Sequence, residues 1–315
     1  MRRQCDREHE GAEELCPAMR TRRANMTIRE ITEKIEAYHP VLPDYDGCDG
    51  FKSGDPDREC TGIACALVPT VDVIRKTIEL GDNLLYVHEP GYYMTPDFPE
   101  WRGGFPNSVY EEKRAMLEAH GIAVYRDHDH THAHSPDGIF AGVIRYLGWE
   151  DYLTETSESL PYCYTFDLPE TTAEDLNETL MEKIGMRGIR YIGRPDARLR
   201  RVMLVPHLYP GAFLEETEKD GVYSDFSTML IRKMEEEGVQ AIIPGEIIEW
   251  NLLSYIADAS MLGRDTACFN IGHFNLEELG AKYARDWIGE LIGHELPVHY
   301  VHTGELWNHQ LKKKA

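Results

Sequence analysis

Between residues 62 and 147, short apolar runs alternate with amphipathic segments, and this order restricts the fold more than any other feature of the chain. Strand-type and helix-type segments follow one another at 62–68, 70–80, 84–87, 108–120, 122–125 and 138–147. Strand–helix–strand units of this kind form parallel sheets that carry helices on their faces. The pattern therefore predicts an α/β fold with a mostly parallel sheet.

The same alternation returns in the last third of the chain, at 202–205, 226–238, 241–244, 251–262, 265–272 and 275–292. Residues 151–200 contain strand-type runs and one helix-type segment, and we expect them to form a connecting or inserted layer. The sequence thus predicts two related α/β halves, at 26–150 and 201–315, with mixed, largely parallel sheets that face each other across a cleft.

The first helix is expected to begin at Thr27, because Thr27 and Glu30 have the spacing of a capping box. Residues 1–25 are rich in arginine, glutamate and cysteine and show no apolar periodicity. We therefore expect them to be a disordered extension that precedes the folded chain.

Four of the 14 histidines lie within seven residues, at 128–134, directly after one of the predicted strands. Imidazole and carboxylate ligands together suit divalent transition metals, and ligand sites in open α/β sheets lie beyond the carboxyl ends of strands. The alternative is a solvated polar loop in which histidines cluster by chance. The position of the loop favours a metal site in the cleft between the two halves.

Two further loops at predicted strand ends carry ligand-type side chains. His88 and Glu89 follow the strand at 84–87, and His273 precedes Glu277 by four residues after the last predicted strand. A lone histidine such as His88 is more often a hydrogen-bonded structural residue. Two metal ions about 3.5–4 Å apart need a bridging carboxylate besides terminal ligands, and Glu277 is the candidate bridge.

The local sequence around Glu277 also predicts how its helix begins. Asn275 is expected to cap the helix, with Glu278 as its capping-box partner. Carboxylates in a first helical turn are favoured by the helix dipole, which is an alternative reason for Glu277 and Glu278 to stand there.

Charge and cysteine usage exclude several classes of protein. The chain has 33 basic and 55 acidic residues and a formal charge of −22, which argues against nucleic acid or an anionic membrane as the main partner. Its seven cysteines form no C-x-x-C pair, so we expect reduced thiols and no cysteine-based zinc site. No apolar run approaches the length of about 18 residues that a membrane span needs. We expect a cytoplasmic protein.

Other known metal and catalytic patterns fit less well. The metallo-β-lactamase pattern H-x-H-x-D-H would need aspartate where His132 stands and histidine where Ala133 stands. The sequence also lacks the G-x-S-x-G, G-x-x-x-x-G-K-[ST] and G-x-G-x-x-G motifs of serine hydrolases, P-loop proteins and dinucleotide-binding folds.

The order of these motifs resembles the NGG-interacting-factor-three-like family, also known as dinuclear metal centre hexameric proteins and as GTP cyclohydrolase I type 2 homologues. The resemblance covers most of residues 26–300. It is carried by the Thr27 helix, His88-Glu89-Pro90, Val124-Tyr125-Arg126-Asp127-His128 and, most specifically, Gly272-His273-x-x-x-Glu277. It implies two similar α/β halves around a dimetal cleft, assembled into a toroidal homohexamer.

Two of the family's ligand positions differ here. The family's first motif is His-His-Pro, and Glu89 replaces its second histidine; four residues after His128 the family has a ligand aspartate, and this chain has His132. Because this loop is one residue longer, Asp129, His130 or His134 could take that role instead of His132. The ligand set that the resemblance implies is His88, Glu89, His128, His132, His273 and Glu277.

The resemblance and the ligands together favour a metal-dependent hydrolase that acts on a phosphorylated or nucleotide-like small molecule. Two divalent ions, Zn, Fe, Mn, Co or Ni, would activate a shared water, and His130 or His207 would act as acid or base. The alternative is a metal-binding scaffold or regulatory assembly protein without turnover.

Overall fold

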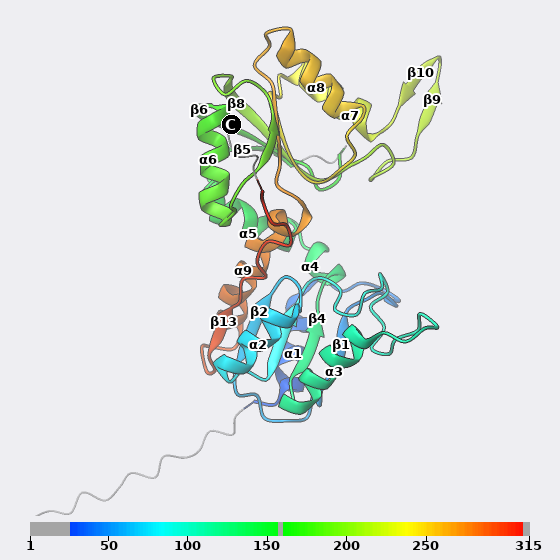
Figure 1. Cartoon of the computed structure of the whole chain (residues 1–315), viewed down its shortest axis with the longest axis vertical. Coiled ribbons are helices and arrows are strands. Elements are labelled where there is room, and N and C mark those ends of the chain that lie inside the picture. The colour runs from blue at the N-terminus through cyan, green and yellow to red at the C-terminus, as the bar shows by residue number, and fades with distance from the viewer. Residues whose placement is uncertain (1–25, 157–159, 311–315) are drawn as a thin grey trace, which may run out of the picture.

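The computed structural model describes residues 26–156 and 160–310. They form two units, each built on its own sheet, which lie one above the other along the long axis of the molecule (Figure 1). The extension expected at 1–25 lies outside the described residues. The predicted capping box is confirmed, since the Thr27 side chain accepts a hydrogen bond from Glu30 N and the Glu30 side chain accepts one from Thr27 N.

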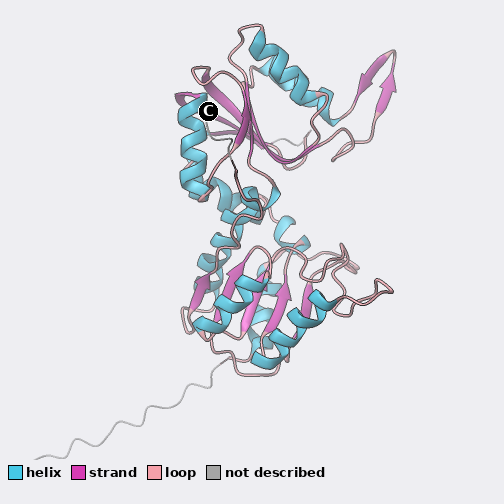
Figure 2. Ribbon diagram, in the orientation of Figure 1, coloured by secondary structure: helices cyan, strands magenta, loops and turns pink. Residues whose placement is uncertain are grey.

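The lower unit contains a five-stranded sheet of order β1-β4-β3-β2-β13. Strands β2, β3, β4 and β13 are parallel, and β1 runs antiparallel to β4 at one edge. The strands are β1 (Gly50–Ser53), β2 (Ile63–Ala66), β3 (Leu84–Val87), β4 (Ala123–Arg126) and β13 (Val298–Tyr300), and the helices around them are α1 (Ile28–Tyr38), α2 (Val71–Leu80) and α3 (Ser108–His120). Figure 2 shows this alternation of strands and covering helices.

The register of the lower sheet places the first two predicted ligand loops side by side. Val87, the last residue of β3, pairs with Arg126, the last residue of β4. The residues that follow these strands, beginning with His88 and Asp127, therefore leave the sheet at the same edge. This edge is the carboxyl edge of the parallel strands, as the sequence predicted.

The upper unit contains a six-stranded mixed sheet of order β5-β6-β8-β11-β12-β7. Strands β8, β11 and β12 are parallel, and β5, β6 and β7 pair antiparallel. Its strands are β5 (Leu153–Thr156), β6 (Tyr164–Thr172), β7 (Arg190–Ile192), β8 (Arg198–Leu208), β11 (Ala241–Ile247) and β12 (Ala267–Asn270). The remaining elements are the 3-10 helix η1 (Glu150–Tyr152), helices α6 (Ala173–Ile184), α7 (Phe226–Glu237) and α8 (Leu252–Met261), and a hairpin of β9 (Thr217–Lys219) and β10 (Val222–Ser224).

The prediction of an α/β fold with mixed sheets is thus confirmed. The lower sheet is largely parallel, as predicted, whereas the upper sheet is parallel only among β8, β11 and β12. The segment at 151–200 supplies β5, β6 and β7, which belong to the same sheet as the strands of the last third. The domain boundaries at 150 and 200 stay a prediction. No helix among the described residues is both long enough and apolar enough to cross a membrane.

The two units are joined by α4 (Asp129–His132), α5 (Gly138–Leu147) and the long helix α9 (His273–Leu291). The first turns of α9 pack into the upper core through Leu276 and Leu279, and its last turns pack into the lower core through Ala284 and Ile288. Helix α9 therefore fixes one sheet relative to the other. The sequence pattern predicted a helix here as the last element, but not that this helix joins the two cores. It also did not predict that β13 returns to the lower sheet.

The predicted start of α9 was wrong. The helix begins at His273 after Gly272, whose φ of 81° allows the chain to turn into it. The Asn275 amide donates to Ile271 O and caps no backbone N–H group, and the Glu278 carboxylate binds Tyr300 and Thr303 instead. Glycine adopts this positive φ without steric cost, and glycine is also tolerated at a helix N-cap without a capping side chain.

Candidate metal centre

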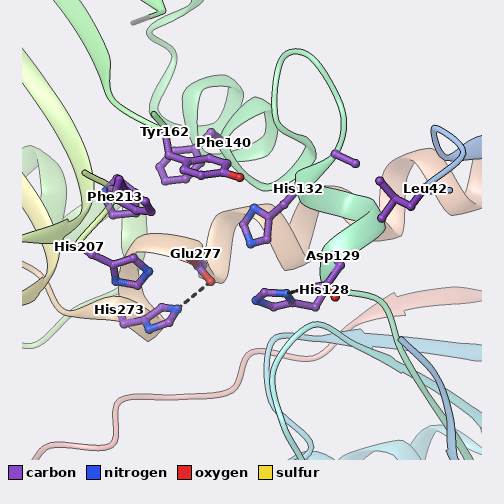
Figure 3. A pocket seen from close by; sticks show the side chains of 12 residues that line it. Leu42, His128, Asp129, His132, Phe140, Tyr162, His207, Phe213, His273 and Glu277 are labelled. Carbon is purple, nitrogen blue, oxygen red and sulfur yellow. Dashed lines mark hydrogen bonds and ion pairs between the residues drawn. The ribbon is translucent and has the colours of Figure 1, made fainter. Parts of the chain in front are cut away.

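The structure brings all six predicted ligands together where the two units meet. They come from three segments, which are the end of β3, the short helix α4 and the first turn of α9. Five of them form two overlapping groups, His88 with His128 and His132, and His88 with Glu89 and Glu277, and His273 forms a further group with His207 and Glu246; within each group the ligand atoms lie within 4.8 Å of one another. Figure 3 shows His128, His132, Glu277 and His273 pointing toward a common space.

Glu277 stands between the two halves of this cluster. Its Oε2 atom lies 3.6 Å from His88 Nε2 and 3.0 Å from His273 Nε2. In the half that contains His273, the Nε2 atom of His273 is also 3.0 Å from Glu89 Oε1. In the half that contains His88, the Nε2 atom of His88 is 3.1 Å from His132 Nε2. One carboxylate oxygen thus lies between a histidine group and a mixed histidine–carboxylate group.

All four imidazoles have an acceptor at Nδ1 and direct Nε2 inward. The acceptors are the Asp127 carbonyl for His88 at 3.0 Å, Asp129 for His128 at 2.7 Å, Asp137 for His132 at 2.6 Å and Glu246 for His273 at 3.2 Å. Such acceptors place the ring hydrogen on Nδ1 and leave the Nε2 lone pair free to bind a metal. With those hydrogens in place, His88 and His132 face each other with two lone pairs, which a cation between them would stabilise.

The carboxylates give independent support for a cation. Glu89 and Glu277 are 7% and 3% exposed, and their oxygens Glu89 Oε1 and Glu277 Oε2 are buried and have no hydrogen-bond partner among the described residues. Both lie near His273 Nε2, but neither contact has hydrogen-bond geometry, and one N–H group could not serve two acceptors well. Unpaired buried carboxylate oxygens are costly. The donor set therefore fits divalent transition ions.

The close approach of buried histidines and carboxylates also shifts the pKa values of these side chains. Burial, together with the neighbouring His128 and His132, lowers the pKa of His88 well below 6.5. Burial also opposes charge on His273, but the carboxylates of Glu277 and Glu89 outweigh it and raise the pKa of His273 to about 11. His88 is thus neutral and ready to coordinate, whereas without metal a proton on His273 balances the two carboxylates.

Asp49 holds the histidine loop in place. Its carboxylate accepts hydrogen bonds from the backbone N–H groups of His128, Asp129 and His130 at 2.6, 3.1 and 2.9 Å. Asp49, in a loop about 80 residues earlier in the chain, thereby satisfies the backbone N–H groups at the start of α4. The sequence offered no signal for this contact, because Asp49 stands in a turn-rich segment among other aspartates.

Asp137 orients one ligand and starts a helix. Its Oδ1 accepts from Ile139 N and Phe140 N at the start of α5, and its Oδ2 binds His132 Nδ1. Sequence reasoning missed this residue, although an aspartate before a glycine-led helix is a recognisable N-cap signal.

The remaining histidines of the loop bind groups other than the cluster. His130 Nδ1 lies 2.6 Å from Asp49 Oδ2, and His134 Nε2 lies 2.7 Å from His39 Nδ1. The second ring nitrogen of His39 binds Asp127 Oδ2 at 2.7 Å. Of the open alternatives for the loop ligand, His132 is the side chain that the structure places against His88, with 3.1 Å between their Nε2 atoms.

His207, the other predicted acid or base, ends up beside the cluster. It lies near the end of β8 with its Nδ1 3.1 Å from Glu246 Oε2, so Glu246 stands between His207 and His273. A cavity of about 440 Å³ opens here, lined by His207, His132 and Glu277 and by the aromatic rings of Tyr162 and Phe213 (Figure 3). His130 is not among the described residues that line it.

Comparison with known families gives one match of broad extent. A model of the DUF34/NIF3 family (NGG1p interacting factor 3) matches residues 26–208. A curated relative, the GTP cyclohydrolase 1 type 2 homolog of Clostridium acetobutylicum, is 22% identical over 261 residues, which cover 80% of this chain and 86% of the relative.

Solved structures resemble the chain over nearly its whole length. Staphylococcus aureus protein SA1388 superposes with a TM-score of 0.62 at 16% identity and covers 91% of this chain and 99% of its own. A Bacillus cereus protein related to NIF3 gives a TM-score of 0.59 at 14% identity, with coverage of 91% and 99%. At these identities the likeness establishes the fold. The presence of candidate metal-binding groups rests on the side chains described above.

Proposed function

The chain belongs to the DUF34/NIF3 (NGG1p interacting factor 3) family, and from this premise we propose that it is a metal-dependent hydrolase that holds two divalent ions between its α/β units. His88, His128 and His132 would hold one ion, and Glu89 and His273 the other. Glu277 would bridge them. The mixed imidazole and carboxylate donors suit Zn, Fe, Mn, Co or Ni.

One observation supports the proposal above all others, which is the common orientation of the four imidazoles. Each ring has a carboxylate or carbonyl acceptor at Nδ1 and directs Nε2 at the same small space. On His88, His128 and His132 these acceptors leave the Nε2 lone pairs facing one another, an arrangement that a bound cation stabilises. The two orphaned carboxylate oxygens in that space support the same reading.

The surrounding residues fit hydrolysis of a small molecule. Divalent ions held by these residues would supply Lewis acidity, which lowers the pKa of bound water and favours hydrolysis at neutral pH. His207 is placed to move a proton, because it lines the cavity and its Nδ1 faces Glu246. Burial and the neighbouring His273 lower the pKa of His207 below 6.5, so His207 would act as a base near neutral pH.

The substrate class that we propose is a phosphorylated or nucleotide-like small molecule. The cavity of about 440 Å³ lies within the range of about 300–1,000 Å³ that small-molecule sites occupy. Tyr162 and Phe213 form part of its wall and offer faces for a ring to pack against. The name of the clostridial relative makes GTP one of the substrates to test.

Metal analysis and substrate assays together test the proposal. Plasma emission spectroscopy should find about one to two divalent ions per chain, the stoichiometry of a dimetal site, and fewer in Glu277→Ala. Phosphodiesters, phosphomonoesters and GTP should be assayed with each of the five metals added. Turnover that Glu277→Ala abolishes supports the hydrolase. Metal binding without turnover of any substrate would instead support a metal-binding scaffold, and a folded protein that takes up no metal would contradict both.

The family resemblance further leads us to propose a cytoplasmic homohexamer. Sedimentation equilibrium of the whole chain tests the assembly, because six copies of a 36.1 kDa chain are well separated in mass from a monomer or dimer.

A further inference from the structure

A second cavity of about 930 Å³ lies on the other side of the metal ligands. Three of the candidate ligands, Glu89, His128 and His273, form one part of its wall, and Lys113 and Arg126 form another. The cavity thus leads from the candidate metal centre to two cationic side chains. The sequence patterns assigned neither of these cations a role in the site.

Arg126 is buried against the ligand-bearing segment. It is 3% exposed, and its Nε donates a 2.9 Å hydrogen bond to the carbonyl oxygen of His88, the residue before Glu89. Its Nη1 atom is buried and has no hydrogen-bond partner among the described residues; the nearest carboxylate oxygen, Asp97 Oδ2, is 3.8 Å away. A buried guanidinium with an unused donor is costly, and an anion in the cavity would satisfy it.

The charges around Arg126 leave an excess of positive charge. Lys52 and Lys113 are 9% and 3% exposed, and the Lys113 ammonium donates to the uncharged carbonyl of Gly91 at 2.6 Å. Burial lowers the pKa of Lys52 and brings that of Lys113 to about 8, and the opposing charge of Asp97, the largest negative charge acting on both lysines, does not offset it. Three buried cations therefore gather around Asp97, in a chain whose net charge is −22.

The other carboxylates of the cavity wall are engaged with the metal centre. Asp129 binds His128 Nδ1 at 2.7 Å, and Glu246 binds His273 Nδ1 at 3.2 Å. A structural ion pair between Arg126 and Asp97 would account for one cation of the group. It would not account for Lys113, which lines the same cavity and forms no ion pair with a carboxylate in the described part of the chain.

We propose that Arg126 and Lys113 bind a phosphate-type dianion of the substrate beside the metal centre. This inference rests on the proposed function and assigns the anionic group of its substrate. A phosphate monoester carries a charge of about −1.5 to −2 at pH 7, which matches the two cations better than a monocarboxylate does. Tyr93 and Phe274 in the same wall offer contact for an apolar or ring part of the molecule.

Titration with inorganic phosphate tests the subsite directly. Calorimetry should show that Lys113→Met and Arg126→Gln each weaken phosphate binding by about tenfold or more, since hydrogen bonds to charged groups contribute about 1.5–3 kcal/mol. Arg114→Gln is the matched control, because Arg114 lies on the same helix as Lys113, is exposed and pairs with Glu118. It should leave phosphate binding unchanged. Acetate, the monocarboxylate probe, should bind more weakly than phosphate.

The titration is run on metal-loaded and chelator-treated protein, with metal content measured for each variant. If the variants weaken phosphate binding but the wild-type chain takes up no metal, the subsite stands and the proposed function is wrong. If metal binds and both variants keep wild-type phosphate affinity, the subsite is wrong. Acetate binding as tight as phosphate binding would also overturn the assignment. Lys113→Met keeps the test informative should Arg126→Gln unfold, since Arg126 also holds the His88 carbonyl.

Discussion

Glu277 and Glu278 are adjacent in the first turns of α9, yet their carboxylates face different surroundings. Glu277 Oε2 lies among the candidate ligand histidines, 3.0 Å from His273 Nε2, without a hydrogen-bond partner among the described residues. Glu278 Oε1 accepts hydrogen bonds from Tyr300 and from the backbone of Thr303 at 2.7 and 2.9 Å. Glu277 is thus available to a metal, whereas Glu278 fixes the segment around Tyr300 and Thr303 against α9.

Glu277→Gln should reduce metal content without unfolding the protein. An amide in place of the carboxylate removes the charge that a bridging ligand supplies, so we expect metal affinity to fall by tenfold or more, of the order found for ligand-supporting residues, about 10–100-fold. Plasma emission spectroscopy after dialysis measures the bound metal. Glu278→Gln is the control, because a glutamine there can still accept from Tyr300 and Thr303 and should keep full metal content. An equal loss in both variants would mean that charge near α9, and not ligation by Glu277, holds the ion.

Asp137→Asn should separate the orientation of His132 from helix capping. Asparagine caps helices as well as aspartate does, so the start of α5 should lose less than about 1 kcal/mol. It cannot, however, both cap α5 and accept from His132 Nδ1, so the His132 ring would lose its fixed tautomer. We expect metal affinity to fall about 10–100-fold, measured by competition with a chromogenic chelator.

Asp225→Asn is the matched control for that change. Asp225 caps α7 by accepting from Thr228 N at 2.7 Å and contacts none of the candidate ligands through any described hydrogen bond. It should show the same small change in thermal stability and wild-type metal affinity. Metal binding of Asp137→Asn at the wild-type level would show that the Asp137–His132 contact is dispensable for ligation.

Stability in acid should reveal the part played by Asp49. Burial alone would raise the pKa of this carboxyl, but the hydrogen bonds from His130 and His128 outweigh it and hold the pKa below 3.8. A carboxyl group whose pKa is depressed in the folded protein contributes its full stabilisation above pH 3.8. This stabilisation is lost as the pH falls through the pKa of the folded state. In Asp49→Asn the new NH₂ group opposes the N–H donors of the loop, at a cost of about 1–3 kcal/mol.

The difference in unfolding free energy between wild type and Asp49→Asn should therefore be constant near neutral pH and shrink as the pH falls below 3.8. Denaturant unfolding of chelator-treated protein across this range measures it without interference from metal. Asp57→Asn, a change at an exposed ion pair with Arg29, should leave stability nearly unchanged, because solvent screens exposed ion pairs. A difference that grows in acid would contradict the assignment.

The sequence predicted the parts of the site that depend on local order and missed those that depend on tertiary contacts. His88, Glu89, His273 and Glu277 follow strands directly, and a parallel sheet brings such positions to one edge. Asp49 and Glu246 reach their histidines across about 80 and 27 residues, and nothing in their neighbourhoods indicates a partner.

The assembly of the two units was also beyond the sequence pattern. The predicted strands and helices gave the α/β class, because apolar periodicity is a local property. How α9 crosses from one core to the other depends on close packing against α5, and that packing depends on two glycines whose role appears only when both helices are in place.

Gly142 and Gly280 set the distance between α5 and α9. A Cβ atom on Gly142 would lie 2.9 Å from Gly280 Cα, and one on Gly280 would lie 2.8 Å from Ile139 Cα. Because backbone cannot yield to relieve such contacts, Gly142→Ala or Gly280→Ala should force the helices apart. The overpacking cost of about 1–3 kcal/mol should exceed the helix-propensity gain of about 1 kcal/mol.

The same displacement should weaken metal binding, since α5 carries His132 through Asp137 and α9 carries Glu277. Gly289→Ala is the control within α9, because its Cβ would meet only the His294 side chain, at 3.3 Å. That variant should gain up to about 1 kcal/mol from helix propensity and keep its metal. Thermal unfolding and chelator competition measure both effects. Wild-type metal affinity in a destabilised Gly280→Ala would show that contacts other than the α5–α9 packing set the spacing of His132 and Glu277.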